Sequence, residues 1–341
     1  MVVRRVRKVS RDPLRIVAIG GGTGLSVLLH GLKPYTGPGG VGLDITAVVT
    51  VTDDGGSSGR LRRDFAVLPP GDIRSCMVAM SEDEALLSRL FQYRFSTGRG
   101  LKGHSFGNLF LTALTDLTGD FAKAVQLSSE VLASCGRIFP STAANVILEA
   151  LLTDGRVVSG ESRISKSKVP IQRIRTVPPH CEPIDDTLAA IERADLITLG
   201  PGSLFTSVIP NLLVRGIPDA IAKSRAIKAY FVNLMWQPGE TMNFRASDHV
   251  AAIHAHAGRP ILDYAMVNTR PITAPLKRRY ATQNAQPVEN DIERMAQLGV
   301  KAVGQKLACE GEKVRHDPAA IAEIALRLAG EGRRRRQRLN G

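Results

Sequence analysis

The hydrophobic pattern at the start of the chain alternates between short apolar runs and helical spacing. Residues 14–20, LRIVAIG, are apolar, rich in β-branched side chains and closed by a glycine, which indicates a buried strand. Leucines on one helix face predict a helix over 24–33, and residues 45–52 predict a second strand. The order strand, glycine turn, helix, strand is typical of a Rossmann-like sheet.

The pattern changes in the middle of the chain. Residues 71–133 predict mainly helices. Residues 145–160, NVILEALLTDGRVVSG, predict an antiparallel hairpin in which Asp154 and Gly155 suit a type I′ turn. The stretch IQRIRTV extends this small β excursion to about residue 177.

The alternation of strands and helices returns in the last third. Strands are predicted at 196–202, 227–233, 264–268 and near 301–303, and a helix at 318–328. We therefore predict a single α/β domain over 14–330, a Rossmann-like, doubly wound, mainly parallel sheet. A helical insertion at about 71–133 and the β-hairpin excursion at about 145–177 interrupt it.

Composition narrows the class of protein. The chain has 341 residues, of which 43% are hydrophobic, enough to fill a core. No stretch approaches the roughly 18 uncharged apolar residues of a membrane helix, and the N-terminus lacks the apolar region of a signal peptide. We therefore expect no membrane span and a cytoplasmic location. The four cysteines stand far apart, which indicates neither a disulfide framework nor a zinc site.

The net charge of +13 is concentrated at the two ends. Six basic residues oppose Asp12 in the first 15 positions, and Arg333–Arg336 with Arg338 oppose Glu331 at the end. We expect residues 1–13 and 331–341 to be solvated, disordered tails. No basic motif interleaved with aromatic residues is present, so we expect no specific nucleic-acid binding. A nucleic-acid or membrane-surface adaptor that uses these tails is a minor alternative.

The glycine-rich turn after the first strand is the first candidate for chemistry. It lacks the last glycine of a dinucleotide motif and the lysine of a P-loop. Glycines still let the backbone approach a ligand, and a following helix N-terminus presents free N–H groups to an anion. A tight turn without a ligand is the alternative, but we favour phosphate or pyrophosphate binding by Gly20, Gly21, Gly22, Thr23, Gly24 and Ser26.

Two carboxylates follow the second strand. Asp53 and Asp54 fall at the carboxyl edge of the predicted sheet, where open α/β folds bind ligands. An acid there accepts hydrogen bonds from a ribose, holds a hard cation or acts as a base, and a turn without a ligand is the alternative.

The stretch after these acids is predicted to be a flexible loop. Residues 55–59 are expected to curl round a bound group, and Arg60 to pair with a phosphate, whereas Arg62 and Arg63 are expected at the surface. The ligand residues predicted in this loop are Gly56, Ser57 and Ser58.

Two further segments place polar residues before helices. Asp72 follows a Pro-Pro-Gly sequence, so it is either a helix N-cap or a site residue. In the stretch LKGHSFGNLF, Ser105 is a candidate N-cap, and His104 and Asn108 carry polar tips suited to a ligand.

The second half repeats the logic of the first glycine loop. A strand ends and a helix opens around Gly200, Pro201, Gly202, Ser203 and Thr206. Two glycine loops on one sheet edge grip opposite ends of a nucleotide.

Other polar residues of the second half extend this edge. Asn233 and Asn268 also end apolar strands there, and Asn243, Arg245 and Asp248 form a further candidate group. The spacing of the nearby histidines matches no zinc signature.

Six motifs in this order resemble those of the gluconeogenesis factor family (YvcK type), which is similar to the 2-phospho-L-lactate transferases (CofD type): GGGTGLS, AVVTVTDDGGSSGRLRRDF, PPGDIRSCMVA, GHSFGNLFL, LGPGSLFTSVIPNLLV and NFRASDHVAAIHAH. The resemblance covers about residues 14–328. It implies a Rossmann-like cytoplasmic protein that binds a UDP-sugar, UDP-N-acetylglucosamine or UDP-glucose, linked to carbon metabolism and to cell-wall and cell-shape control.

The resemblance also implies roles for residues. The glycine loops at 20–24 and 200–202 would hold the diphosphate. Asp53 or Asp54 would be the magnesium-binding or catalytic carboxylate of a transferase, or a ligand-orienting acid of a sensor. Asn243, Arg245 and Asp248 would lie near the nucleobase or sugar.

Two functions follow from this resemblance. The leading hypothesis is a UDP-sugar-binding regulator, expected as a homodimer, which requires no cofactor. The alternative is a transferase that moves a phospholactyl or phosphoenolpyruvyl group from a nucleotide diphosphate donor to a deazaflavin alcohol with Mg²⁺.

Overall fold

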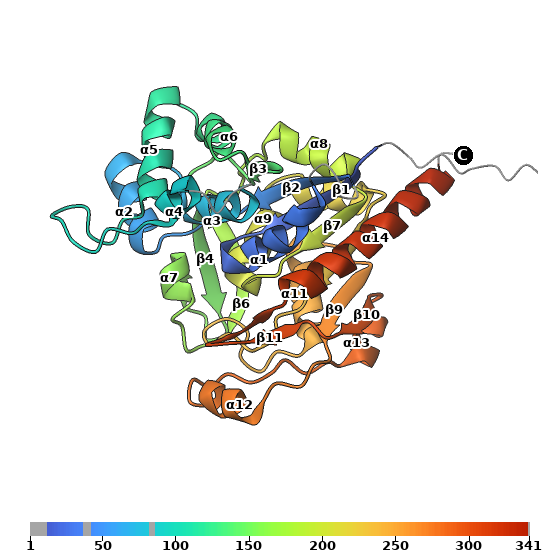
Figure 1. Ribbon diagram of the computed structural model, residues 1–341. Coiled ribbons are helices and arrows are strands. Elements are labelled where there is room, and N and C mark those ends of the chain that lie inside the picture. The colour runs from blue at the N-terminus through green and yellow to red at the C-terminus, as the bar shows by residue number, and fades with distance from the viewer. Residues whose placement is uncertain (1–11, 37–41, 82–85, 340–341) are drawn as a thin grey trace, which may run out of the picture.

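The computed structural model describes residues 12–36, 42–81 and 86–339 (Figure 1). Its centre is a seven-stranded sheet in the order β10-β9-β8-β7-β1-β2-β3, in which all paired strands run parallel. These strands are β1 (Leu14–Gly20), β2 (Leu43–Val49), β3 (Arg137–Pro140), β7 (Leu196–Leu199), β8 (Ile227–Phe231), β9 (Tyr264–Asn268) and β10 (Lys301–Gln305). The predicted fold class is confirmed.

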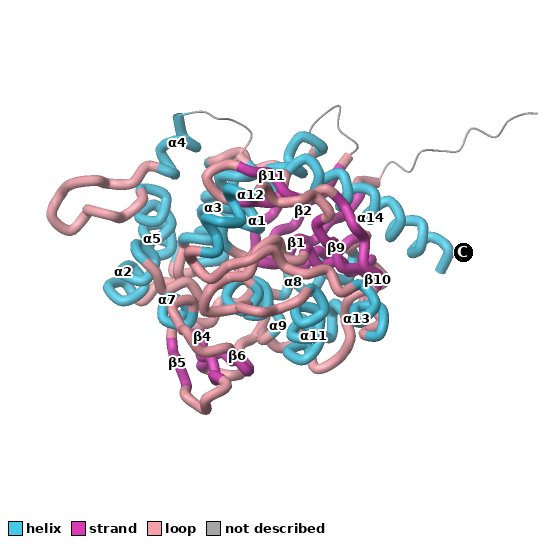
Figure 2. The backbone as a smooth tube through the Cα atoms, turned by 90° about the horizontal axis from the view of Figure 1, so that it is seen from below, coloured by secondary structure: helices cyan, strands magenta, loops and turns pink. Residues whose placement is uncertain are grey.

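Helices cover both faces of this sheet (Figure 2). One face carries α1 (Gly22–Leu32), α3 (Gly71–Met80) and α14 (Pro318–Leu339), and the other carries α8 (Asp185–Arg193), α9 (Ile209–Leu212), α10 (Ile217–Lys223), α11 (Ala246–Ala257) and α13 (Ile292–Gln297). Because both faces are covered, the central strands are almost continuously apolar, and Ile16, Ile19 and Ile45 are fully buried.

The strand order reverses beside β1. The chain passes from β1 to β2 on one side and later to β7 on the other, so the ends of β1 and β7 open a crevice at the carboxyl edge. Ile19 pairs with Leu199, so the turns that follow the two strands start at the same level. Open α/β sheets bind ligands at such a switch point.

Two excursions leave the core. The helical one follows α3 and contains α4 (Leu86–Gln92), α5 (Phe106–Thr118) and α6 (Phe121–Val131). The other is an antiparallel sheet in the order β5-β4-β6, made of β4 (Ile147–Leu152), β5 (Val157–Ser159) and β6 (Ile171–Val177). The predicted type I′ turn is wrong. That turn needs positive φ at both central positions, but Gly155 has positive φ and Asp154 does not.

The segment predicted as a flexible loop round a ligand is a helix. Residues Gly56–Phe65 form α2, in which the Gly59 N–H donates to the Gly55 carbonyl. Ser57 and Ser58 are buried and contact partners on the helical excursion, the His104 ring and the Asn108 amide. Packing against residues about 50 positions away therefore overrides the loop-like composition.

The arginine-rich C-terminal segment, predicted as a disordered tail, is helical and partly buried in the structure. Helix α14 continues through Leu339, and the Arg333 side chain is buried against Asp195, with N–O distances of 2.9 and 2.7 Å. A Cβ at Gly332 would lie 1.9 Å from the Asp195 carbonyl oxygen, so glycine permits this close approach. Residues 331–339 are therefore part of the fold, while residues 1–11, most of the predicted N-terminal tail, lie outside the described residues.

Arg62 is the other arginine whose predicted place is wrong. Arg63 is exposed as expected, but Arg62 is half-buried and donates to the Val146 carbonyl. Burial lowers the pKa of Arg62, and the charge of Asp54 opposes that effect.

Within the described ranges, no helix has the length and apolarity needed to cross a membrane.

Candidate functional site

The two glycine loops lie against each other at the switch point. A Cβ on Gly24, in the first turn of α1, would lie 2.5 Å from the Pro201 carbonyl oxygen and 2.7 Å from the Gly202 nitrogen. A Cβ on Gly202 would lie 3.4 Å from the Gly21 carbonyl oxygen. Segments about 180 residues apart in sequence thus form one corner in which the backbone is accessible.

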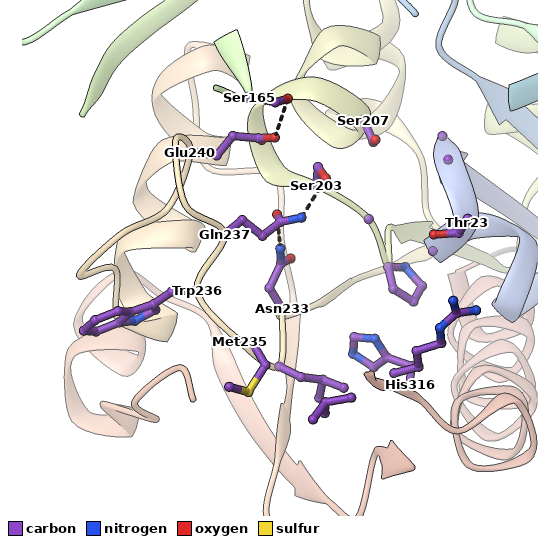
Figure 3. Close-up of a pocket in the computed structure, with 18 of the residues that line it drawn as sticks. Thr23, Ser165, Ser203, Ser207, Asn233, Met235, Trp236, Gln237, Glu240 and His316 are labelled. Atoms are coloured by element: carbon purple, nitrogen blue, oxygen red, sulfur yellow. Dashed lines mark hydrogen bonds between the residues drawn. The ribbon is translucent and has the colours of Figure 1, made fainter. Parts of the chain in front are cut away.

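A cavity of about 610 Å³ opens beside this corner, a size typical of small-molecule sites. Its walls include α7 (Glu161–Ile164), α12 (Ala274–Ala281) with the turn that follows it, and the strand β12 (Val314–His316), which pairs with β11 (Ala308–Glu310). Figure 3 shows Thr23, Ser203 and Asn233 around it. The predicted residues that line the cavity are Gly21, Gly22, Thr23, Gly24, Asp53, Asp72, Pro201, Gly202, Ser203 and Asn233.

A chain of amides runs from β8 to the second glycine loop (Figure 3). The Asn233 Nδ2 donates to Gln237 Oε1 at 2.6 Å, and the Gln237 Nε2 donates to Ser203 Oγ at 2.8 Å. The Tyr230 hydroxyl donates to Asn233 Oδ1 at 3.3 Å. These bonds fix the rotamers of Asn233 and Gln237, so this wall is pre-organised.

Carboxylates occupy another part of the lining. Asp72 is not the N-cap of α3, because that position is Pro70, and its carboxylate instead accepts a hydrogen bond from the Gly22 N–H. Burial, and then the charge of Asp53, raise the pKa of Asp72 to about 7. Burial and the same Asp53 charge also raise the pKa of Glu161. An added cation or a bound proton therefore lowers the repulsion between these groups.

Glu240 is a further carboxylate on this cavity. It accepts hydrogen bonds from the Phe205 N–H at 3.1 Å, from Thr206 Oγ1 at 3.0 Å and from Ser165 Oγ at 3.4 Å. Burial raises the pKa of Glu240, and these donors oppose that shift. Thr206, predicted as a ligand residue, therefore binds Glu240 instead of lining the cavity.

Several other predicted residues hold the fold around the cavity without lining it. Asp54 accepts from the Ser162 N–H at 2.8 Å and so positions α7, and Ser26 bonds the Gly22 carbonyl. Arg60, predicted to bind phosphate, donates to the Lys102 carbonyl. Gly20 and Gly200 lie behind the glycine corner, and Gly56 is exposed at the start of α2.

The polar residues at the entrance of α5 form structural contacts. Ser105 caps the helix as predicted, because its hydroxyl accepts from the Asn108 N–H. The Asn108 side chain accepts from Arg74 Nε at 2.9 Å. His104 lies 3.0 Å from the Ser57 hydroxyl, and burial and the nearby Arg60 lower its pKa. Neither His104 nor Asn108 lines the cavity.

The group Asn243, Arg245 and Asp248 lies at the start of α11. The Arg245 N–H donates to Asp248 at 2.8 Å in a capping arrangement, and the Arg245 side chain approaches Glu289. Asn243 has a φ of 64°. These three residues form a helix start outside the cavity lining.

Sequence reasoning missed part of the site. Trp236 and Gln237 follow β8 at the carboxyl edge, so the argument used for Asn233 would have found them. Glu161, Glu240 and the β12 pair Arg315 and His316 carry no local signal. Burial lowers the pKa of His316 to about 4, and its Nε2 donates to the Val232 carbonyl, so it is a neutral ring at pH 7.

Comparison with known proteins identifies the family. Residues 16–308 match the family described as 2-phospho-L-lactate transferase CofD. The chain belongs to the CofD family. The gluconeogenesis factor of Bacillus subtilis is 45% identical over 318 residues, 93% of this chain and 98% of that protein. The gluconeogenesis factor of Halalkalibacterium halodurans is 46% identical over 312 residues, 91% of this chain and 95% of that protein.

A solved structure agrees with this assignment. A crystal structure of a Bacillus halodurans protein has a TM-score of 0.89 and 45% identity, and covers 92% of this chain and 100% of that one. The resemblance to gluconeogenesis factors of the CofD family is therefore confirmed. The match to the family ends at residue 308, so the cavity residues Arg315 and His316 lie outside the matched range.

Proposed function

We propose that this protein is a regulator that binds a UDP-sugar, UDP-N-acetylglucosamine or UDP-glucose, in the cavity at the switch point. The observation that carries the proposal is the contact between the two glycine loops, with Gly24 against Pro201 and Gly202, in the lining of a cavity of about 610 Å³. Backbone N–H groups and the α1 N-terminus suit a diphosphate, which agrees with the family's nucleotide-linked chemistry.

The carboxylates support a hydroxyl-rich second half of the ligand. Asp53 and Asp72 accept hydrogen bonds, and a sugar or ribose hydroxyl is a donor of the matching kind. The amides of Asn233 and Gln237 offer both donors and acceptors on another wall. A regulator of carbon metabolism and cell shape, acting in the cytoplasm as a homodimer, is the biological role that the relatives' names and the family resemblance suggest.

Magnesium fits this site only if the bound ligand supplies part of its coordination. Among the described residues there is no group of three or more His, Cys, Asp or Glu placed to hold a metal ion. Mg²⁺ is often bound by one or two carboxylates together with substrate phosphates, and Asp53 and Asp72 offer two. A bound ion would neutralise phosphate charge, while the chain's own residues position the ligand. Asp54, the other predicted metal ligand, faces Ser162.

Ligand binding is measurable through the single tryptophan, Trp236, which lines the cavity. We expect its fluorescence to change on titration with UDP-N-acetylglucosamine or UDP-glucose, with and without Mg²⁺, and calorimetry to give the same affinity. The variant Gln237→Ala removes the amide bridge to Ser203 and should weaken binding. The matched control is Gln126→Ala, on α6 and outside the cavity lining. The absence of heat and of a fluorescence change with either UDP-sugar would refute the proposal.

A transferase is the second candidate, and the acids Asp53 and Asp72 beside the glycine corner favour it. Phosphoryl-type transfer needs positioning and charge stabilisation more than a distinctive nucleophile. Incubation with a deazaflavin alcohol, Mg²⁺ and phospholactyl or phosphoenolpyruvyl nucleotide donors should give a product of increased mass. Binding of UDP-sugars without any such product would leave the regulator as the function.

A further inference from the structure

A second cavity of about 240 Å³ lies at the carboxyl ends of β8 and β9. It shares Asn233 and Leu234 with the first cavity and otherwise has its own walls. These walls come from the loop after β9, from α12 and from residues 287–290. The region belongs to the same sheet edge but lies two strands from the glycine corner.

Asn268 builds the rigid part of this second cavity. Its Oδ1 accepts from the backbone N–H groups of Arg270, Leu307 and Ala308 at 3.0–3.2 Å, and its Nδ2 donates to the Arg270 carbonyl at 2.7 Å. The Asn290 Nδ2 donates to the Asn268 carbonyl at 2.8 Å. Asn268, predicted from sequence as a ligand residue, is thus the side chain that holds the loop carrying Arg270 in place.

The charge of the second cavity is opposite to that of the first. Among the described residues its lining contains Arg270 and Lys277 and no carboxylate, whereas the first cavity is lined by four carboxylates and one cation, Arg315. The Arg270 guanidinium is oriented by one bond to the Ala308 carbonyl at 3.2 Å. Lys277 makes no ion pair within the described residues. Three acids close in sequence to its walls have partners elsewhere: Glu310 accepts from the Thr273 N–H, Glu289 pairs with Arg245, and Asp291 accepts from Ser247.

The second cavity also has uncharged polar residues in its lining. Thr269, Asn233 and Asn290 bring a hydroxyl and two amides to the same cavity. Two cations and N–H or O–H donors around a small volume are the groups that bind phosphate oxygens in proteins. The volume is smaller than the typical range for drug-sized ligands, so it suits a phosphate-sized group better than a nucleotide.

We propose that the cavity between Arg270, Lys277 and Asn290 binds a phosphate group, free or as a monoester, separately from the ligand of the first cavity. The proposal adds a second binding site to the proposed function and does not depend on it. The two cavities share Asn233, which donates to Gln237, and Gln237 donates to Ser203 in the second glycine loop.

Calorimetry in a phosphate-free buffer tests this site, with inorganic phosphate and a hexose phosphate as separate probes. We expect one phosphate group to bind per chain. The variant Lys277→Ala should lower the phosphate affinity roughly tenfold, the usual effect of losing a hydrogen bond to a charged group. The control Arg278→Ala removes the same charge from the next position of α12, which lines neither cavity, and should leave the affinity unchanged. The probe that binds more tightly identifies the source of the phosphate.

Three results would overturn the proposal. The first is no binding of either probe, and the second is an equal loss of affinity in Lys277→Ala and Arg278→Ala, which would indicate a general charge effect. The third is complete displacement of phosphate by a saturating UDP-sugar, which would place phosphate in the first cavity. Phosphate binding that depends on Lys277 in a protein that ignores UDP-sugars would support this site while refuting the proposed function.

Discussion

The buried ion pair between α14 and β7 allows a direct test of whether the arginine-rich end is structural. Asp195 is fully buried, and its carboxylate is bound by Arg333 at 2.9 and 2.7 Å, by Arg336 at 2.9 Å and by the Arg15 N–H at 2.9 Å. We predict that Arg333→Met, which keeps an apolar stem but removes the guanidinium, strongly destabilises the protein.

The magnitude follows from what remains around Asp195. Removing one partner of a buried pair typically costs about 3–5 kcal/mol, because the other charge stays buried and under-compensated. Arg336 still reaches the carboxylate at 2.9 Å, so Arg333→Met should lie at the low end, about 3 kcal/mol. The neighbouring Arg335 pairs with Asp263 at 3.5 Å with half of its side chain exposed, so Arg335→Met should cost less than about 1 kcal/mol.

Urea unfolding followed by far-ultraviolet circular dichroism measures both free energies. Adding Asp195→Asn to Arg333→Met should recover part of the lost stability, because the buried carboxylate charge is then removed, while Arg336 loses its ion pair and keeps its bond to the Arg193 carbonyl. A loss of stability in Arg333→Met no larger than that in Arg335→Met would refute the reasoning and indicate that the segment is a solvated tail.

Four further predictions concern the first cavity. Gly24→Ala places a methyl group 2.5 Å from the Pro201 carbonyl oxygen, so the glycine loops must separate; we expect a loss of about 1–3 kcal/mol in urea unfolding and of the Trp236 response to UDP-sugars. Because the pKa of Asp72 is raised to about 7, this carboxyl becomes negatively charged between pH 6 and 8. Without Mg²⁺, the affinity for UDP-sugars measured by calorimetry should therefore fall roughly fivefold over that range. The variant Asp72→Asn should abolish this pH dependence. The same raised pKa makes protonation favour the folded state, so wild-type stability in urea should fall as pH rises from about 4 to about 7 and level off above that, and Asp72→Asn should remove that fall. Glu240→Ala leaves the Phe205 N–H and the Thr206 hydroxyl without their acceptor, and denaturation should show a loss of about 1–3 kcal/mol per buried group.

The sheet and the glycine corner could be predicted because their signals are local. Each central strand is an apolar run, and the turns after β1 and β7 are rich in glycine. Parallel strands carry their carboxyl ends to one edge, so the meeting of the two turns follows from the fold class alone. The contact of Gly24 with Pro201 and Gly202 is the structural form of that prediction.

The differences between the sequence-based predictions and the structure arise from contacts between distant parts of the chain. Ser57 and Ser58 are read from sequence as loop residues, yet their partners His104 and Asn108 stand 47 and 50 positions away. Arg333 lies 138 positions from Asp195, so its charge pattern alone is indistinguishable from that of a solvated tail. The charge of Arg60 predicts a phosphate partner, but its Nη2 donates to the Lys102 carbonyl, 42 positions away.

The polarity of the two cavities carries the functional argument further than the glycine loops do. Glycine turns with free N–H groups occur at the switch point of many nucleotide-binding sheets, so they indicate a phosphate without indicating what is attached to it. The acids Asp53, Asp72 and Glu161 beside that corner disfavour a second anionic group there, since an added negative charge acts in the same direction as the Asp53 charge, which raises the pKa of both Asp72 and Glu161. A ligand with a diphosphate at one end and neutral hydroxyls at the other satisfies both halves of the first cavity. An additional anion then has a better place across Asn233, where Arg270 and Lys277 line a cavity without carboxylates.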